Sequence, residues 1–281
     1  MIKKLIYTSG ATGFIGKNFI PSLLSVYDEV INFTSKETIQ IYSKNKVTEQ
    51  EISIDFIKRH PSSEFFNLAT LYIPNPGSIS EMKNLIDANI LFPIRTLEYL
   101  KIFDNLKIVN ILSYTQLLDF ANQNIYSLSK EMFKKFIFFH HTSNIINLYL
   151  FDTFGNGDTR NKVADVFIRS ILSGSPITIP KNEVNINLTH NSAVSESLLK
   201  SLLLDPGEYC VKSPDSISLE NLAYLIMDIS GKRTQVFKKN SVLNPLSLIK
   251  SFPKNVFINP KGYNFKNHLE DRIQEIRKNE F

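Results

Sequence analysis

Short apolar runs alternate with longer segments of helical periodicity over the first 150 residues of the chain. Their period and length predict strands at residues 3–8, 29–34, 51–55, 64–69, 106–112 and 145–151. Helices are expected at residues 14–26, 80–103 and 125–141. Strands that alternate with helices are typical of a parallel sheet covered on both faces, so we expect a doubly wound α/β fold.

The alternation becomes less regular after Gly155. Short strands are expected near Ile177 and Asn185, and helices near Ala193, Leu219 and Phe265. We therefore predict a first domain over residues 1–155, with return segments near residues 185–205, and a smaller carboxyl-terminal lobe made mainly of residues 156–281.

Glycine is scarce in this chain, yet it clusters at one place. The 281 residues include 10 glycines, and Gly10, Gly13 and Gly16 lie between a predicted strand and a predicted helix. Such glycines permit a tight turn, close approach of the backbone to a pyrophosphate, and close packing of helix on strand. The amino terminus of the helix then faces the phosphates with free N–H groups. The pattern predicts a Rossmann-like dinucleotide-binding domain, and a structural turn without a ligand is the alternative.

The end of the second predicted strand should decide which dinucleotide binds. Residues 32–36 read Asn-Phe-Thr-Ser-Lys, with no carboxylate before Glu37. Hydroxyl groups followed by Lys36 suit a 2′-phosphate better than a bare ribose, so NADP(H) is preferred and NAD(H) stays possible. A solvated loop lysine is the alternative interpretation. Asp55 and Phe56 would close the third strand beside the adenine.

The composition is that of a folded globular protein, with 43% apolar residues. No run approaches the roughly 20 continuous apolar residues that a membrane span requires, and the amino-terminal apolar run is too short for a signal peptide. We therefore expect a cytoplasmic protein without membrane insertion. The single cysteine, Cys210, excludes an internal disulfide, and its apolar surroundings favour a buried thiol over a nucleophile.

The net charge of +5 is unevenly distributed, because residues 232–281 hold 11 Lys or Arg against 4 Asp or Glu. These charges are dispersed among apolar residues, so we expect a folded basic surface and no nucleic-acid partner. Lys254, Lys261 and Lys266 are candidates to contact a nucleotide diphosphate, with solvated lysines as the alternative. The five histidines show no metal-ligand spacing, so no metal site is expected.

A tyrosine and a lysine share one face of the helix expected at residues 125–141. Tyr126 and Lys130 are four residues apart, as are Tyr42 and Lys46. Position separates the two pairs, because Tyr126 begins the helix that follows the strand ending near Ser113, where a nicotinamide would lie.

Six segments in the first 160 residues resemble the extended short-chain dehydrogenase/reductase family, also called the NAD-dependent epimerase/dehydratase family. They are TSGATGFIG at 8–16, IDF at 54–56, NLAT at 67–70, VNILS at 109–113, YSLSK at 126–130 and LFDTFGNGDTR at 150–160. NLTHNSAV at 187–194 is similar to a later family segment. Residues 150–162 most resemble reductases of the CDP-abequose synthase type, which act on nucleotide-linked 4-keto deoxysugars.

The resemblance implies catalytic roles for three residues. Tyr126 would donate a proton to the ketone oxygen as hydride arrives from the cofactor, and Ser113 would hydrogen-bond the same oxygen. Lys130 would favour the phenolate and hold the nicotinamide ribose. Cofactor-binding residues would be Gly10, Thr12, Gly13, Phe14, Ile15, Gly16, Ser35, Lys36, Asp55, Phe56, Leu68, Ala69, Thr70 and Phe151. Asp158 and Arg160 lie where the lobes should meet, and either contact the substrate or form a structural ion pair.

The chain also departs from the family pattern. Dehydratases of the family carry an Asp-Glu pair directly after the hydroxyl residue, whereas Tyr114 and Thr115 follow Ser113 here. Removal of water from a hexose is therefore not expected. The predicted function is NAD(P)H-dependent reduction of a nucleotide-linked 4-keto deoxysugar. A sugar 4-epimerase with tightly bound NAD and a non-catalytic nucleotide-sensing protein are the alternatives. A homodimer is expected because the Tyr126 helix and the one before it commonly form the family's dimer interface.

Overall fold

The computed structural model of the chain describes residues 3–140 and 144–281, and in these residues the main sheet has nine strands. In spatial order they are β15 (Lys254–Asn255), β12 (Gly207–Val211), β7 (Ile145–Leu150), β6 (Lys107–Ser113), β5 (Glu64–Asn67), β1 (Leu5–Ser9), β2 (Glu29–Phe33), β3 (Thr38–Ser43) and β4 (Lys46–Glu51). Neighbouring strands from β15 to β2 run parallel, and the β2–β3 and β3–β4 pairs are antiparallel. The predicted α/β fold with a parallel sheet is confirmed.

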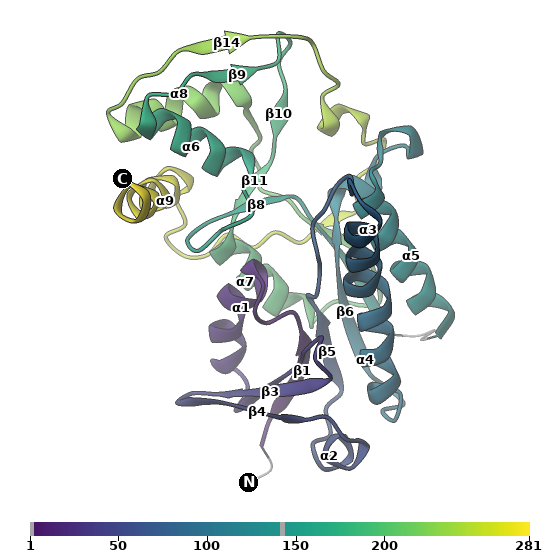
Figure 1. The fold of residues 1–281 in the computed structure, drawn as a ribbon. Coiled ribbons are helices and arrows are strands. Elements are labelled where there is room, and N and C mark those ends of the chain that lie inside the picture. Colours follow the sequence, from purple (N-terminus) through teal and green to yellow (C-terminus); the bar gives the residue numbers. More distant parts are fainter. Residues whose placement is uncertain (1–2, 141–143) are drawn as a thin grey trace.

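Helices cover both faces of the sheet (Figure 1). One face packs against α1 (Phe14–Leu24) and α7 (Asn191–Ser201). The other face packs against α4 (Phe92–Leu100) and α5 (Ile125–His140), with α2 (Ile54–Arg59) at its edge and α3 (Ile79–Ile86) preceding α4. Because both faces are covered, the parallel strands are apolar almost throughout, and all five residues of β1 are buried.

A ladder of buried polar side chains crosses the strands beneath the carboxyl-terminal edge of the sheet. The Ser9 hydroxyl donates to Asn67 Oδ1 at 2.8 Å, Asn67 Nδ2 to Asn110 Oδ1 at 3.0 Å, and Asn110 Nδ2 to Asn147 Oδ1 at 3.1 Å. A slip of one residue in any strand would leave these amides buried without partners. The ladder therefore favours one register for the strands that carry the cleft described below.

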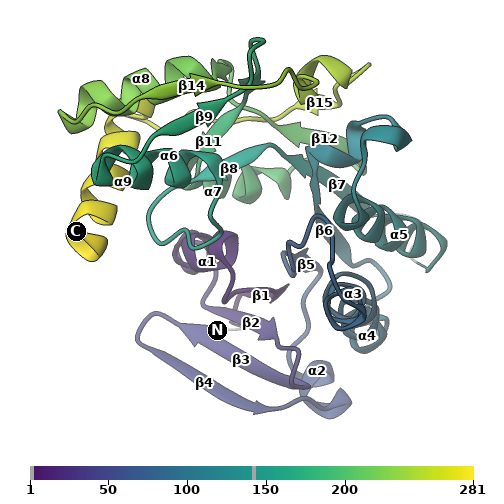
Figure 2. The same cartoon turned by 45° about the horizontal axis from the view of Figure 1, so that its top comes forward.

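A second core lies beyond this edge of the sheet (Figure 2). It is formed by α6 (Val163–Ser173), α8 (Leu219–Ser230) and α9 (Phe265–Glu280), with β8 (Asp152–Phe154), β9 (Ile177–Ile179), β10 (Asn185–Ile186), β11 (Leu188–His190), β13 (Ile217–Ser218) and β14 (Val236–Lys238). A buried ion pair of 2.6 Å between Arg272 and Asp165 joins α9 to α6. Shorter helical segments are η2 (Tyr114–Leu117), η3 (Phe120–Asn122) and η4 (Pro245–Leu248).

The expected third strand at residues 51–55 is wrong. The chain instead forms the β3–β4 hairpin after β2, and residues 54–59 are the helix α2. The Ser53 side chain accepts a hydrogen bond from the Phe56 N–H at 3.1 Å and so caps this helix. Asp55 lies in its first turn, where a carboxylate is favourable.

The expected helix at residues 80–103 is interrupted by a π-helical turn, η1 (Asp87–Leu91). Pro93 lacks the N–H that would donate to the carbonyl of Asn89, and the Phe92 N–H donates to Asp87 five residues back. The helix expected at 125–141 is observed as α5, and its last predicted residue, His141, lies outside the described residues. No helix in the described part of the chain combines the length and apolar character needed to cross a membrane.

Candidate active site

A cleft of about 810 Å³ opens at the carboxyl ends of β1, β2, β5, β6 and β7. In an open parallel sheet, ligands bind at this edge where the strand order reverses, and here the reversal lies between β1 and β5. Most of the predicted site residues line the cleft: Gly10, Thr12, Gly13, Phe14, Ile15, Gly16, Ser35, Lys36, Leu68, Ala69, Thr70, Ser113, Tyr126, Lys130, Phe151 and Arg160.

A side chain is excluded at two of the three clustered glycines by the neighbouring backbone, and at the third there is room for one. A Cβ on Gly10 would lie 2.6 Å from the Ala69 backbone nitrogen, and one on Gly16 would lie 2.2 Å from the Gly10 carbonyl oxygen. These two glycines therefore allow backbone segments to pack closely. A Cβ on Gly13 would meet nothing nearer than the Gly10 oxygen at 3.4 Å, and Gly13 lines the cleft. Its missing side chain leaves room for a ligand beside the backbone.

The first turn of α1 presents free donors to this space. The N–H groups of Phe14, Ile15 and Gly16 have no backbone partner among the described residues, as expected for a helix amino terminus, and this first turn holds no acidic residue. The Ala11 N–H donates to Asn32 Oδ1 at 3.0 Å, which fixes the loop before the helix. The loop of residues 10–13 and the first turn of α1, together called the glycine cradle below, therefore fit a pyrophosphate.

Tyr126, Ser113 and Thr70 meet at the other end of the cleft. Tyr126 is 7% exposed, and its hydroxyl group lies close to the side chains of Thr70 and Ser113. Burial raises the pKa of Tyr126, while the neighbouring Thr70 and Ser113 hydroxyl groups and the nearby Arg160 oppose that rise. Tyr126 is therefore protonated at neutral pH and can donate a proton to a group bound beside Ser113.

Lys130 lies one helical turn after Tyr126 on α5 and faces the same cleft. Its side chain is 2% exposed, and among the described residues its ammonium has no ion-pair partner and no side-chain hydrogen bond. Burial lowers the pKa of Lys130 to about 7. A buried donor without acceptors fits a ligand that brings hydroxyl oxygens, such as the ribose of a nicotinamide nucleotide.

Ser113 is held in place by the turn that follows β6. The Ser113 N–H donates to Gln116 Oε1 at 3.0 Å, and Gln116 Nε2 donates to Glu131 Oε2 on α5 at 3.1 Å. The Ser113 hydroxyl lies 2.9 Å from Thr115 Oγ1. This capping box links the carboxyl end of β6 to the helix that carries Tyr126.

The β3–β4 hairpin brings a carboxylate that the sequence interpretation missed. Glu49 on β4 lines the cleft near Lys36, accepting hydrogen bonds from Thr38 Oγ1 at 2.8 Å and Gln40 Nε2 at 3.2 Å. These hydrogen bonds and the charge of Lys36 lower the pKa of Glu49. The alternation at residues 39–41 and the Lys44-Asn45 turn were the signal for β3, whereas β4 shows no such alternation.

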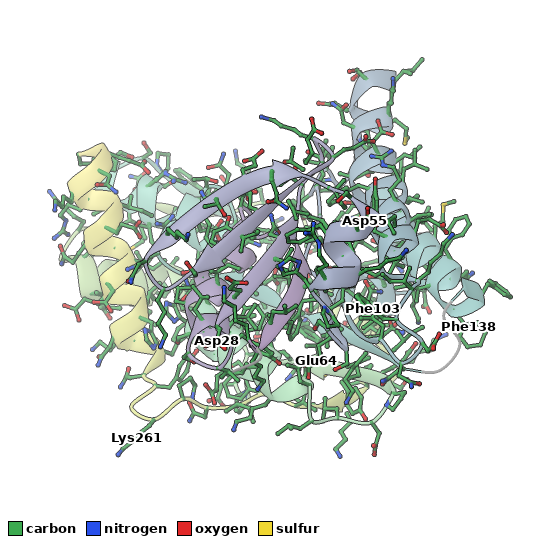
Figure 3. All side chains as sticks on the ribbon, turned by 90° about the horizontal axis from the view of Figure 1, so that it is seen from below. Asp28, Asp55, Glu64, Phe103, Phe138 and Lys261 are labelled. Carbon is green, nitrogen blue, oxygen red and sulfur yellow. The ribbon has the colours of Figure 1, made fainter. Side chains whose placement is uncertain are left out.

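Asp55 and Phe56 do not reach the cleft. They lie on α2, where Asp55 is exposed and Phe56 is buried in the core against α4 and its neighbours. Figure 3 labels Asp55 on this helix. The expected place beside an adenine is therefore wrong, because it depended on a strand that does not form. The alternative pair Tyr42 and Lys46 lies on the hairpin strands and not on one helix.

Asp158 and Arg160 form the structural ion pair. Arg160 Nε and Nη2 donate to the two carboxylate oxygens of Asp158 at 2.8 and 2.7 Å, and Asp158 is buried outside the cleft lining. The guanidinium of Arg160 also lies 4.2 Å from the centre of the Phe14 ring and lines the cleft. The expectation that Asp158 contacts a substrate is therefore wrong, whereas Arg160 stays a candidate.

The remaining basic and thiol candidates lie elsewhere. Lys254, Lys261 and Lys266 are exposed and do not line the cleft, and Figure 3 shows Lys261 far from Asp55, beside the loop that leads to α9. Cys210 is 1% exposed on β12, and burial raises its pKa to about 11, so the interpretation as a buried thiol is confirmed.

Four further side chains line the cleft near Tyr126 and were missed: Tyr72, Tyr114, Asp152 and Lys162. The Tyr72 ring lies edge-on to that of Tyr126 with centroids 4.9 Å apart, and Lys162 Nζ lies 3.6 Å from the Tyr72 centroid. Each of the four closely follows a residue already recognised as part of the site. These four residues could have been predicted, because residues that follow the carboxyl ends of parallel strands lie at the ligand-binding edge of the sheet.

The chain is similar to known proteins over nearly its whole length. The model of the family described as the NAD dependent epimerase/dehydratase family matches residues 6–186. CDP-abequose synthase from Yersinia pseudotuberculosis is 25% identical over 288 residues, covering 96% of this chain and 96% of that protein.

Two solved structures illustrate the shared fold. UDP-N-acetylglucosamine 4-epimerase from Methanobrevibacter ruminantium M1, in complex with UDP-N-acetylmuramic acid, has a TM-score of 0.73 at 18% identity and covers 99% of both chains. dTDP-glucose 4,6-dehydratase from Bacillus anthracis, in complex with NAD, has a TM-score of 0.72 at 17% identity, covering 99% of this chain and 97% of that chain.

Proposed function

The chain belongs to the NAD dependent epimerase/dehydratase family, and on that premise we propose that it reduces the keto group of a nucleotide-linked 4-keto deoxysugar with hydride from NAD(P)H. The observation that carries the proposal is the meeting of Tyr126 with Ser113, beside the free ammonium of Lys130, in the cleft that begins at the glycine cradle. CDP-abequose synthase, to which the chain is similar along 96% of its length, supports this substrate class.

The residues of the cleft divide the work of binding and proton transfer. The glycine loop and the first turn of α1 would hold the pyrophosphate of the dinucleotide, and Lys130 would hold the nicotinamide ribose. The bound nicotinamide supplies the hydride. Ser113 would hydrogen-bond the ketone oxygen, and Tyr126 would transfer its phenolic proton to that oxygen as the alkoxide forms.

Two features favour reduction over the other reactions of the family. Burial raises the pKa of Tyr126, which keeps the phenol protonated, and that is the form a reductase needs in its proton donor. Tyr114 and Thr115 follow Ser113, so no carboxylate adjoins it in sequence to assist the loss of water. Lys36 at the cleft rim supports a preference for NADP(H) over NAD(H).

The proposal is tested by incubating the protein with CDP-, dTDP- and UDP-linked 4-keto-6-deoxyglucose and either NADPH or NADH. A reductase consumes the nicotinamide absorbance in proportion to the sugar reduced. An epimerase would convert the sugar without net loss of absorbance, and a nucleotide sensor would bind without turnover. Either of those two results, with all three nucleotides, would overturn the assignment as a reductase.

A further inference from the structure

A buried glutamine lies beside Ser113, and the mechanism above gives it no part. The Gln116 side chain is 8% exposed and does not line the cleft. Its Oε1 accepts the Ser113 N–H at 3.0 Å, and its Nε2 donates to Glu131 Oε2 at 3.1 Å. Both ends of one amide are therefore used, one toward the end of the strand β6 and the other toward the helix α5.

The carboxylate of Glu131 decides which way this amide faces. An ionised carboxylate only accepts hydrogen bonds and a backbone N–H only donates, so the Gln116 oxygen must face Ser113 and the nitrogen must face Glu131. The charge of the acceptor also makes the second hydrogen bond stronger than one between neutral groups. Glu131 lies 4.0 Å from Lys134 Nζ, which pairs with Glu208 on β12 at 2.5 Å. The amide is therefore anchored to α5 through a carboxylate that has cations beside it.

The position of the Ser113 hydroxyl depends on this anchored turn. Its Oγ lies 2.9 Å from Thr115 Oγ1 and accepts the Thr115 N–H at 3.3 Å. Both of these groups belong to the turn η2, and Gln116 is the next residue of that turn. Gln123 Nε2 fixes the same turn by donating to the Gln116 carbonyl oxygen at 3.1 Å. The Tyr126 hydroxyl, which lies close to Ser113, is instead carried by α5.

We propose that Gln116 and Glu131 are positioning residues, which keep the Ser113 hydroxyl at the distance from Tyr126 at which both can reach one ketone oxygen. The inference rests on the proposed function, because that function requires the two groups to meet at one oxygen. Neither Gln116 nor Glu131 lines the cleft, so both act through Ser113 and not on a ligand. A shift of about 1 Å at such a site can cost on the order of a hundredfold in rate.

Exchanging the two side chains tests the pair. Gln116→Glu places a second carboxylate against Glu131, so we expect kcat to fall about tenfold to a hundredfold. The double variant Gln116→Glu, Glu131→Gln restores an acceptor for the Ser113 N–H and a donor–acceptor pair between the two positions, so kcat should return to within about threefold of wild type. With the 4-keto sugar nucleotide that the wild type reduces, KM and the cofactor dissociation constant should stay within about twofold in every variant.

Two further comparisons separate positioning from a loss of stability. Glu131→Ala removes the acceptor and should lower kcat about tenfold, whereas Glu131→Gln keeps a neutral acceptor and should lower it less. Ile226→Val, in the buried second core, is the control for lost stability and should leave kcat unchanged. Glu131 is only partly buried, so its two variants decide the matter if Gln116→Glu does not fold.

The outcomes separate the two proposals. A wild type that reduces no 4-keto sugar nucleotide would overturn the proposed function and this role with it. An active wild type whose kcat is unchanged in Gln116→Glu and in Glu131→Ala would overturn the positioning role alone. A double variant no faster than Gln116→Glu would overturn it too, and so would losses of kcat matched by equal losses of cofactor affinity, because these would show a purely structural pair.

Discussion

Tyr126 and Lys130 lie one helical turn apart, and burial shifts their pKa values in opposite directions because it disfavours the charged form of each. The pKa of Tyr126 rises, and the pKa of Lys130 falls to about 7. In the described residues the protein offers Lys130 no compensating carboxylate. The uncompensated ammonium of Lys130 therefore destabilises the cofactor-free protein, but it provides a hydrogen-bond donor for a dinucleotide.

Because burial of the Lys130 ammonium destabilises the folded protein, removing that ammonium should stabilise it, by an amount that depends on pH. The folded-state pKa of Lys130, about 7, lies below the ordinary value of 10.5, so the unfolded chain binds the proton more tightly. The penalty is fully present below pH 7 and disappears as pH rises toward 10.5. We expect Lys130→Met to raise the free energy of unfolding by on the order of 2–4 kcal/mol at neutral pH and by much less near pH 10.

Denaturant unfolding of the cofactor-free protein at both pH values measures this difference. Lys134→Met, one turn further along α5, is the control. Lys134 pairs with Glu208 at 2.5 Å and donates to Tyr149, so its loss should destabilise the protein. A Lys130→Met variant less stable than wild type at neutral pH would contradict the account.

The glycine loop gives a second prediction at the scale of single residues. Gly16→Ala would place a methyl group 2.2 Å from the Gly10 oxygen, and we expect it to destabilise the fold by several kcal/mol, on the order of the largest single-residue effects. Gly13→Ala has room, and Gly13 already has φ −74°, so the fold should persist while dinucleotide affinity falls tenfold or more. Thermal unfolding and NAD(P)H fluorescence titration measure the two effects. Equal effects of both variants on stability would count against these separate roles.

The sequence predicted individual elements best where the sheet is buried on both faces. β1, β6 and β7 are continuous apolar runs because helices cover them, and their ends fall within about two residues of the expected positions. β4 could not be found from apolar periodicity, because all six of its residues are exposed. The apolar pattern of residues 51–55 predicted a strand, but the cap at Ser53 starts a helix at Ile54. Glu49 was missed for the same reason, since it lies on the unrecognised hairpin.

The β3–β4 hairpin places Glu49 near Lys36, and the two charges should act in opposite directions on the choice between NADPH and NADH. Lys36 should attract a 2′-phosphate, and the nearby carboxylate of Glu49 should repel it. We expect Lys36→Ala to lower the affinity for NADPH about three- to tenfold, with little change for NADH, and Glu49→Gln to shift the ratio toward NADPH. Glu51→Gln, at the exposed end of the same strand, is the control. Fluorescence titration gives the dissociation constants of NADPH and NADH. Equal changes in the two constants would contradict a role of Lys36 and Glu49 in cofactor choice.

At the scale of the whole molecule, the sequence predicted the order of the main strands and helices apart from the β3–β4 hairpin and α2, but not how the second core meets the cleft. Arg272, near the carboxyl end of the chain, pairs with Asp165 and donates to the backbone oxygen of Asp158 at 2.5 Å. It thereby fixes the loop that carries Arg160. Contacts of this kind join residues more than 100 positions apart, and no local pattern in one sequence reveals them. Helical periodicity predicted α9 itself, but not its partners.

We expect a homodimer built on α5. Phe133 on this helix is buried in the core, while Met132, Phe138 and Phe139 are 51%, 66% and 78% exposed. Figure 3 shows Phe138 at the outer edge of the molecule. A second copy could cover this apolar surface. Sedimentation velocity should give a dimer for wild type at micromolar concentration and a monomer for the double variant Phe138→Asp, Phe139→Asp, and a wild-type monomer would exclude the interface.

The most direct test of the central claim is hydride transfer by Tyr126→Phe. The variant keeps the ring that packs against Tyr72 but removes the hydroxyl group shared with Ser113 and Thr70. The measurement is the rate of NAD(P)H consumption with the 4-keto sugar nucleotide that the wild type reduces, together with the dissociation constant of the cofactor. The account predicts that kcat falls by a factor of about 10² to 10⁴ while the cofactor dissociation constant is unchanged. Turnover at the wild-type rate would contradict it.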